Sequence, residues 1–588
     1  MRQFLKMFFA SFLGMLVFAV LGVFILVIWI AGLASSVSSD KPAVGTRAVL
    51  YLDLGQAIQE QVQDNPLSGF SADDNYDTPG LYDLVRLIKY AKTDSAVKGI
   101  YIKCSDNANG FATSDELRMA LQDFKTSRKF IYSYADVIAQ RAYYVANVAD
   151  RIYCNPKGGL EWKGFSLQYM FFKQALDKLG IEPQVFYAGK FKSATEPFRT
   201  DKMTDANRLQ SSVFLNDLYS RFLTETAAAR HIDTATLHQY ANTMALATAA
   251  DAVKYQLIDG LRYDDEVKEE IKKRLALTGT DKINFLPVGK YAKAVNYKTG
   301  KGSDRIALIY AQGNIVDGKG DKGEIGGDTY RGLIRTARMD DNIKAIVIRV
   351  NSGGGSAMAS ENMWREISLA RKQKPVVLSF GDYAASGGYY MSCGADSIFT
   401  QANTLTGSIG VFSIIPNMQK LFNDKLGISF DGVKTGAYAD APTSSRPMNE
   451  MEKQYFQNSV DTIYNTFIHR VSEGRRINVA LVDSIGQGRV WTGTRGIDLG
   501  LADKIGGLQD AIDCAARMGK TKEYKIKEYP EPLSWLETIF GGYKKNMQAK
   551  AMKEALGEEG MNIYQSVKKI KATVGTAQAR LPFELTVN

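Results

Sequence analysis

The chain of 588 residues contains the same passage twice, and this internal duplication limits the folds that are open to it. Residues 97–165 align with residues 343–411 without a gap at a constant offset of 246, so that Ile100 meets Ile346. A repeat of this length is far beyond the roughly 20–50 residues of a solenoid unit, and it indicates a duplicated domain. We therefore expect two tandem domains, each large enough to bury its own core.

Each copy alternates short apolar stretches with helical patterns. In the first copy, GIYIKC, KFIYSYA and RIYCN are typical of strands, and SDELRMALQDFKT and QRAYYVANVA are typical of helices. The second copy repeats this order, with AIVIRV, PVVLSF and SIFT as its strands. Such alternation predicts βαβ units around a mainly parallel sheet, so the expected fold class is α/β. Helix-rich stretches near 202–247 and 447–487 are expected to close the two domains.

An apolar stretch near the N-terminus predicts a membrane anchor. From Phe8 to Leu33 there are 26 residues without a charge, and about 20 apolar residues span a bilayer. A cleavable signal peptide is the alternative, but its apolar core is usually about 7–15 residues long, so we expect an uncleaved, single-pass anchor. Arg2 and Lys6 precede the span. The positive-inside rule then puts the N-terminus in the cytoplasm and the bulk of the chain on the far side.

Composition excludes several classes of function. The net charge is +10, but the charges are spread along the chain and alternate in sign, which favours an ordinary solvated surface. No basic run is interleaved with aromatic residues, so nucleic-acid binding is not expected. The four cysteines lack CxxC or zinc spacing, and the sequence has neither an HExxH motif nor a P-loop. We therefore expect free buried thiols, no metal and no cofactor.

Residues suited to nucleophilic chemistry occur in the second copy. Ser386 follows the strand PVVLSF and opens a helix, whereas Gln140 stands at the matching position of the first copy. Gly354 and Gly355 follow another predicted strand. Because turns after neighbouring parallel strands face one crevice, Ser386 is a candidate nucleophile, and one of these glycines together with Gly387 is a candidate oxyanion hole. A plain helix cap at Ser386 and a tight glycine loop are the simpler alternatives.

A serine nucleophile needs a base, and none of the three histidines has a supporting context. The usual substitute is a lysine that burial keeps neutral. The segment GKFKSATEPF in the first copy supplies Lys190 and Lys192, and the corresponding segment of the second copy has no lysine after Thr435. A solvated surface charge is the simpler interpretation of either lysine. If one of them is the base, the two copies carry complementary parts of one site.

Four passages carry a family resemblance: AASGGYY around Ser386, TLTGSIG (404–410), NSGGGSAMASE (351–361) and GKFKSATEPF (189–198). Together they resemble the signal peptide peptidase A (protease IV) family, in its long, duplicated, membrane-anchored form. The resemblance implies a ClpP/crotonase-like fold for both domains, Ser386 as nucleophile, Lys192 as general base and Ser408 as the serine that orients this lysine. The family's SPGGS loop is here SGGGS, without the proline, so the choice of donor glycine stays open.

The same resemblance implies an ATP-independent serine endopeptidase that degrades hydrophobic peptides, such as cleaved signal peptides, through an acyl-enzyme. It also implies a homo-oligomer, a tetramer in the long form, that is anchored in the inner (cytoplasmic) membrane with its catalytic domains on the periplasmic side. A crotonase-type acyl-CoA enzyme and a non-enzymatic membrane scaffold are the alternatives. The expected parts of the chain are an anchor with its linker (1–45), a lysine-supplying domain (46–300), a serine-supplying domain (301–520) and a helical extension (521–588).

Overall fold

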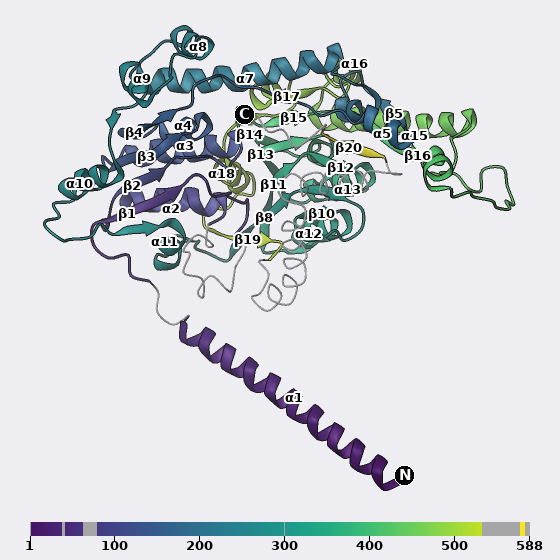
Figure 1. Ribbon diagram of the computed structural model, residues 1–588, viewed down its shortest axis with the longest axis horizontal. Helices are drawn as coiled ribbons and strands as arrows, with labels where there is room; N and C mark the ends of the chain where they lie inside the picture. Colours follow the sequence, from purple (N-terminus) through teal and green to yellow (C-terminus); the bar gives the residue numbers. More distant parts are fainter. Residues whose placement is uncertain (1, 38–41, 63–78, 299, 532–576, 582–588) are drawn as a thin grey trace.

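A computed structural model describes residues 2–37, 42–62, 79–298, 300–531 and 577–581 of the chain (Figure 1). Each half of the chain contributes a mainly parallel sheet with helices packed on it, so the predicted α/β class is confirmed. A third sheet combines strands from both halves. The boundaries predicted near residues 45, 300 and 520 stay predictions.

The sheet of the first half has the strand order β6-β4-β3-β2-β1-β7, and its neighbours pair in parallel. Its strands are β1 (Ala48–Asp53), β2 (Val97–Lys103), β3 (Phe130–Ile138), β4 (Arg151–Leu160), β6 (Gly260–Leu261) and β7 (Phe285–Pro287). The helices of this half are α2 (Leu81–Thr93), α3 (Phe111–Lys125), α4 (Gln140–Ala146), α5 (Lys173–Leu179), the 3-10 turn η2 (Ser193–Thr195), α6 (Glu196–Arg199), α7 (Asp205–Arg230), α8 (Thr234–Asn242), α9 (Ala249–Lys254), α10 (Asp264–Arg274) and α11 (Val288–Ala294).

The sheet of the second half has the order β17-β15-β13-β11-β8-β19, and β14 and β18 extend it beside β13. Its strands are β8 (Asp304–Gln312), β11 (Ile343–Ser352), β13 (Val376–Ala385), β14 (Ser397–Thr400), β15 (Leu405–Gly407), β17 (Val490–Thr492), β18 (Lys504–Ile505) and β19 (Tyr524–Tyr529). The helices of this half are α12 (Gly327–Met339), α13 (Ala357–Arg371), α14 (Gly387–Ser392), the π-helix η3 (Leu421–Leu426), α15 (Glu450–Arg475), α16 (Val479–Ile485), α17 (Gly493–Asp498) and α18 (Leu508–Met518).

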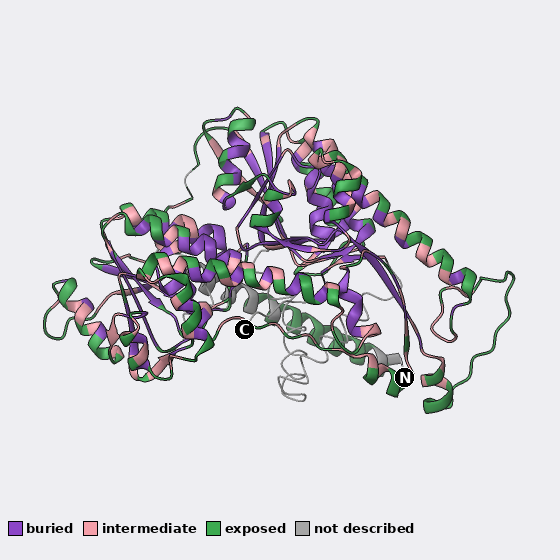
Figure 2. Ribbon diagram, turned by 90° about the horizontal axis from the view of Figure 1, so that it is seen from above, coloured by how far each residue is buried: buried purple, intermediate pink, exposed green. Residues whose placement is uncertain are grey.

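The two halves bury separate cores that reflect the duplication. Ile100 of β2 packs in the first core and Ile346 of β11 packs in the second. Figure 2 shows the buried residues, in purple, concentrated on the strands and on the helix faces that cover them. The middle residues of β2 and β11 are apolar in a continuous run, because helices cover the two faces of a parallel sheet. The duplication extends to polar contacts: the hydroxyl groups of Tyr143 and Tyr389 donate to the carbonyl oxygens of Leu257 and Leu501, respectively.

The third sheet joins the halves, with the order β10-β9-β12-β20-β16-β5. Its edge strand β5 belongs to the first half of the chain, yet it pairs antiparallel with β16 of the second half, from Ala188 opposite Val411 to Glu182 opposite Asn417. Figure 1 shows β5 beside β16 and α15, away from β1 to β4. The strands are β5 (Glu182–Ala188), β9 (Asn314–Val316), β10 (Glu324–Gly326), β12 (Gly354–Ser356), β16 (Val411–Asn417) and β20 (Gln578–Arg580).

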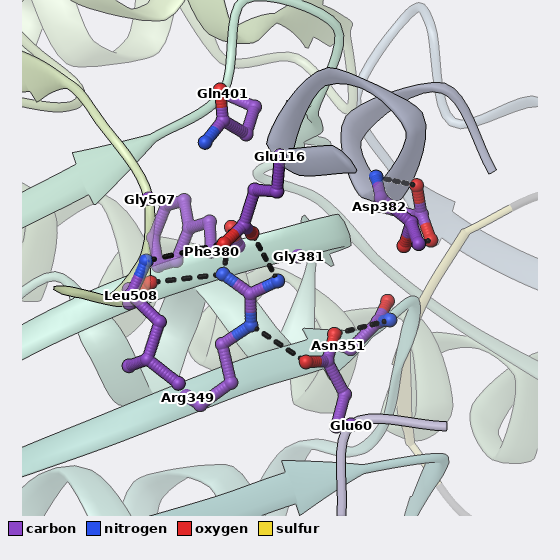
Figure 3. A network of polar contacts seen from close by, with 12 residues as sticks. Glu60, Glu116, Arg349, Asn351, Phe380, Gly381, Asp382, Gln401, Gly507 and Leu508 are labelled. Carbon is purple, nitrogen blue, oxygen red and sulfur yellow. Dashed lines mark hydrogen bonds and ion pairs between the residues drawn. The ribbon is translucent and has the colours of Figure 1, made fainter. Parts of the chain in front are cut away.

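A buried polar network also links the halves (Figure 3). Arg349 of β11 is fully buried and donates to Glu60 at 2.9 Å and to Glu116 of α3 at 2.6 Å. The remaining carboxylate oxygens are also satisfied, because Asn351 donates to Glu60 and the backbone N–H of Leu508 donates to Glu116. Burial raises the pKa of Glu116, and the charge of Arg349 opposes this rise. The network fixes the first half against the strand that leads to the glycine loop.

Helix α1 (Arg2–Val37) projects from the body in Figure 1. Within the described part of the chain, no helix is both long and apolar enough to cross a membrane; the side chains at 23 and 26–33 of the predicted anchor lie outside the described residues. The predicted helical extension contains the strands β19 and β20 instead of helix among its described residues, and its segments 532–576 and 582–588 lie outside them.

Candidate active site

Ser386 lies directly after β13, at the start of α14, in a strained backbone conformation. Its φ of 54° and ψ of −115° are unusual for a residue other than glycine, and such conformations cost on the order of 1–3 kcal/mol. The backbone holds it there, because the N–H of Ser386 donates to the carbonyl oxygen of Gly407 and its own carbonyl accepts from Tyr390. Since β13 and β15 pair with Ala385 opposite Gly407, Ser386 is placed beside Ser408.

The side chain of Lys192 meets both serines. Its Nζ lies 2.7 Å from the Oγ of Ser386, 3.1 Å from the Oγ of Ser408 and 3.3 Å from the carbonyl oxygen of Ser408. Lys192 is 1% exposed, and both serines are 0% exposed. Lys192 therefore contacts both of the serines predicted from the sequence within one chain. Lys190, in contrast, is exposed and outside this cluster.

The β5–β16 ladder explains why a lysine of the first half reaches a serine of the second. The ladder ends at Ala188, and the chain then turns at Gly189, whose φ is 112°. The N–H of Phe191 donates to the carbonyl oxygen of Gln487 at 2.7 Å. At the neighbouring Gly488, a Cβ atom would lie only 2.6 Å from the backbone nitrogen of Lys192. This close backbone approach requires glycine at position 488 and fixes the Lys192 loop.

Helix α7 supports the lysine loop from the other side. The buried amide of Gln210 donates to the carbonyl oxygen of Phe191 at 3.0 Å and to the Oγ of Ser193 at 2.8 Å. Its oxygen accepts from the N–H of Val490, which belongs to β17 of the second half. One side chain thus connects the loop that carries Lys192 to the sheet that carries Ser386. No local pattern marks Gln210 in the sequence, so its role could not be predicted.

The electrostatic setting favours an uncharged lysine. Burial lowers the pKa of Lys192 well below its ordinary value of 10.5, since desolvation penalises the ammonium form. The polar groups at hydrogen-bond distance from its Nζ are neutral serine oxygens. A neutral amine beside a serine hydroxyl can accept the hydroxyl proton, so the pair is suited to general-base activation of Ser386.

The predicted glycines lie next to Ser386. Gly354 has a φ of 100°, and its N–H donates to the Oγ of Ser352, so this N–H is engaged within its own loop. Gly355 follows in β12. A Cβ atom on Gly387 would lie 3.1 Å from the backbone nitrogen of Gly355, so the two backbones approach closely. A Cβ atom on Gly354 would lie 2.6 Å from the backbone nitrogen of Gly387, so both glycines approach Gly387. Because the N–H of Gly354 is already engaged by Ser352, Gly355 is the better candidate for the partner of Gly387 in an oxyanion hole.

The corresponding place in the first half is filled by larger side chains. Gln140, opposite Ser386, donates to the carbonyl oxygen of Gly164 and accepts from the N–H of Lys163. Trp162 lies opposite Ser408 at the same offset, is buried, and donates its indole N–H to the carbonyl oxygen of Leu237. Both side chains have structural partners. Trp162 was not among the predicted residues, although the constant offset of 246 places it opposite Ser408.

A buried lysine against a serine hydroxyl, beside close-packed glycine backbone in a duplicated α/β fold, is the arrangement of a serine hydrolase that works without histidine. The model of peptidase family S49 matches residues 123–278 and 368–522, one segment in each half. The chain belongs to peptidase family S49 and is a serine peptidase.

Named relatives agree with this assignment over most of the chain. Protease 4 of Salmonella typhi is 32% identical over 529 residues, which cover 88% of this chain and 82% of that protein. Protease 4 of Haemophilus influenzae is 30% identical to this chain, and the match covers 80% of this chain and 79% of that protein. The chloroplastic serine protease SPPA of Arabidopsis thaliana is 31% identical to this chain, and the match covers 84% of this chain and 73% of that protein. The peptidase is thereby favoured over the acyl-CoA enzyme and the non-enzymatic scaffold.

Proposed function

We propose that Ser386 and Lys192 form the catalytic dyad of this peptidase and that Ser408 orients Lys192. The observation that carries the proposal is the 2.7 Å separation of Lys192 Nζ and Ser386 Oγ in a buried site. Neutral Lys192 takes the proton of Ser386, whose oxygen attacks a peptide carbonyl carbon. Lys192 then protonates the leaving amine and activates the water that hydrolyses the acyl-enzyme.

The N–H groups of Gly355 and Gly387 hold the oxyanion of the tetrahedral intermediate in this mechanism. Donors of this kind act where negative charge develops, and the loss of one typically lowers the rate about 100- to 1,000-fold. The choice of Gly355 is supported by the N–H of Gly354, which already donates to the Oγ of Ser352. The strained φ of Ser386 supports its role as well, because such strain is concentrated at functional sites.

The substrates that we propose are hydrophobic peptides, such as the remnants of signal peptides, cleaved at a membrane surface. The resemblance described above supports this choice, as does the uncharged stretch from Phe8 to Leu33, which would anchor the chain. The charges of Arg2 and Lys6 support a cytoplasmic N-terminus, with the catalytic domains on the periplasmic side of the inner membrane. A homotetramer is part of the same proposal.

Active-site labelling combined with peptide turnover tests the dyad. Ser386→Ala and Lys192→Ala should each abolish labelling by a fluorophosphonate and reduce cleavage of a hydrophobic peptide by at least about 1,000-fold. Ser392→Ala and Lys190→Ala are matched controls: Ser392 is a buried serine of α14 that donates to Gly388, and Lys190 is exposed. Both controls should retain activity. If the Lys192 variant kept normal turnover and the Lys190 variant lost it, the general base would be Lys190 and not Lys192.

A further inference from the structure

A buried carboxylate follows the turn that carries Lys192. Glu196 begins α6, four residues after Lys192, and it is 1% exposed. Burial of a carboxylate is costly unless hydrogen bonds or a cation satisfy it. The proton transfers between Lys192 and Ser386 do not involve Glu196, so the position of this side chain requires an explanation of its own.

The first turn of α7 satisfies most of this carboxylate. Thr204 donates its hydroxyl group to Oε1 of Glu196 at 2.6 Å and its backbone N–H to Oε2 at 3.2 Å. The side-chain amide of Asn207 donates to Oε2 at 2.9 Å. A negative charge is also favourable near the N-terminus of a helix. Glu196 thus connects the segment that follows Lys192 to the start of α7.

A first branch of hydrogen bonds leads from Glu196 back to the lysine turn through α7. The side-chain oxygen of Asn207 accepts from the amide of Gln210 at 3.2 Å. This amide also donates to the carbonyl oxygen of Phe191 and to the Oγ of Ser193, the two neighbours of Lys192. Both intermediate side chains, Asn207 and Gln210, are buried. Movement of Glu196 would therefore be transmitted to both sides of the lysine.

A second branch connects Glu196 to Lys192 through α6. The hydroxyl group of Thr195 donates to the carbonyl oxygen of Lys192 at 3.4 Å and accepts from Nε of Arg199 at 3.0 Å. The guanidinium group of Arg199 lies 3.8 Å from Oε1 of Glu196 and 4.6 Å from the ring centre of Tyr187 in β5. Among the described residues, Arg199 is the one cation within 4 Å of this carboxylate. The two branches and Glu196 form a closed ring around the turn.

The duplication provides an independent comparison. At the constant offset of 246, Pro442 stands opposite Glu196, in the segment TGAYADAPTS of the second half. That segment has no lysine after Thr435. The half without the lysine therefore also lacks the carboxylate, as expected if the carboxylate serves the lysine.

We propose that Glu196 is a positioning residue for Lys192: its hydrogen bonds hold the lysine turn so that the amine stays against Ser386 and away from water. The proposal rests on the proposed function of Ser386 and Lys192. Displacement of a reacting group by about 1 Å can cost about 100-fold in rate, and hydration of the amine would favour its inactive, charged form. The carboxylate acts as a hydrogen-bond acceptor in this role, and its charge is not required.

Substitution of Glu196 in the full-length protein tests this role by kinetics and by pH dependence. In Glu196→Ala, kcat for a hydrophobic peptide should fall at least about 10-fold, with KM nearly unchanged because the substrate is not displaced. Burial lowers the pKa of Lys192 from 10.5, so a turn that admits water should move the midpoint of fluorophosphonate labelling of Ser386 to higher pH. A loss of stability alone would lower the folded fraction and leave this midpoint in place.

A conservative variant and a matched control separate positioning from folding. Glu196→Gln keeps an acceptor for Asn207 and gains an amide that can donate to the Oγ of Thr204, so its turnover and midpoint should stay close to wild type. Glu366 is a buried glutamate of α13 that accepts from Arg338 at 2.8 Å. Glu366→Ala should lose stability without a shift of the midpoint.

The outcomes that contradict the proposal are distinct from those that contradict the dyad. A wild-type kcat or an unshifted midpoint in Glu196→Ala would overturn the positioning role, and a loss in Glu196→Gln equal to that in Glu196→Ala would overturn its hydrogen-bond basis. Where Glu196→Ala does not fold, Gln210→Met carries the same expectation, because it breaks one branch without leaving a buried charge. Full turnover by Lys192→Ala would contradict the proposed function itself.

Discussion

Lys192 obtains its chemistry from burial alone, without a carboxylate at hydrogen-bond distance from its Nζ among the described residues. A lysine paired with an acid is held in the charged form, whereas desolvation favours the neutral amine. The neutral serine oxygens at 2.7 and 3.1 Å from Nζ orient the amine, but they carry no negative charge that would stabilise its protonated form. The same residue therefore controls both the rate of the enzyme and its stability as functions of pH.

The rate of acylation should follow the deprotonation of Lys192. Because the neutral amine is the active form and its pKa is lowered, fluorophosphonate labelling of Ser386 should rise with pH and reach a plateau. We expect the midpoint well below 10.5. Second-order labelling rates measured from pH 5 to pH 10 give this midpoint. A midpoint at or above 10.5 would contradict a lysine base that burial keeps neutral.

The buried amine should also leave a signature in stability. The folded-state pKa of Lys192 lies below that of the unfolded chain, about 10.4, so between the two values the unfolded chain binds the extra proton. Linkage then makes this residue's contribution unfavourable at neutral pH, and stability recovers by about 1.4 kcal/mol per pH unit until the unfolded pKa is reached. Lys192→Met should therefore be more stable than the wild type at pH 7, with a gain that shrinks towards pH 10. Urea unfolding of both proteins, with Lys190→Met as control, measures this difference.

Among the elements, the strand pair β5 and β16 decides whether an active site exists. The turn after β5 sets Lys192 against the second half, and Gly488 gives its backbone room to approach. Displacement of a reacting group by about 1 Å can cost about 100-fold in rate. The position of Lys192 relative to the second half therefore depends on backbone contacts and not on the catalytic side chains themselves.

A methyl group at position 488 tests this dependence. In Gly488→Ala the new Cβ would lie 2.6 Å from the nitrogen of Lys192, and the φ of 78° disfavours alanine as well. We expect peptide turnover to fall by at least about 10-fold, through displacement of the Lys192 loop. In the control Gly432→Ala, no atom of the described residues lies within 4 Å of the added Cβ, so turnover should stay unchanged. Equal turnover in both variants would show that peptide cleavage does not depend on the exact position of the Lys192 loop.

The elements that the sequence predicts well are those with local patterns. The strands β2, β3, β11 and β13 and their helices follow from apolar runs and periodicity. The pairing of β5 with β16 could not be predicted, because the two strands lie more than 200 residues apart and a short alternating stretch carries no information about its partner. For the same reason, motif and resemblance could name Ser386, Lys192 and Ser408, but only the fold supplies their distances.

At the scale of the whole molecule, the halves are held together by polar groups as well as by the shared sheet. Arg349 and the carboxylates of Glu60 and Glu116 satisfy one another at the junction. A fully paired network of this kind adds little stability compared with apolar residues, but its disruption is costly because unpaired charges stay buried. The junction therefore specifies one relative placement of the two halves.

Removal of the central cation should destabilise the whole chain. Arg349→Met leaves two buried carboxylates without their counter-ion, and we expect a loss of about 3–5 kcal/mol in the free energy of unfolding. Arg331→Met is the matched control, since Arg331 forms a half-exposed pair with Asp328, and such pairs contribute about 0–1 kcal/mol. Urea unfolding at neutral pH compares the two variants. A loss below about 1 kcal/mol for Arg349→Met would show that the junction does not depend on this residue.

The pairing of β5 with β16 also has a consequence for the order of synthesis. Lys192 leaves the ribosome early, but its position depends on a strand that ends at Asn417, 225 residues later (417 minus 192). At roughly 5–20 residues per second, this interval lasts roughly 10–45 s. During that time the nascent polypeptide contains a lysine without the strand that positions it. A partly made peptidase is therefore inert, and hydrolysis begins only when both halves have been translated and have docked.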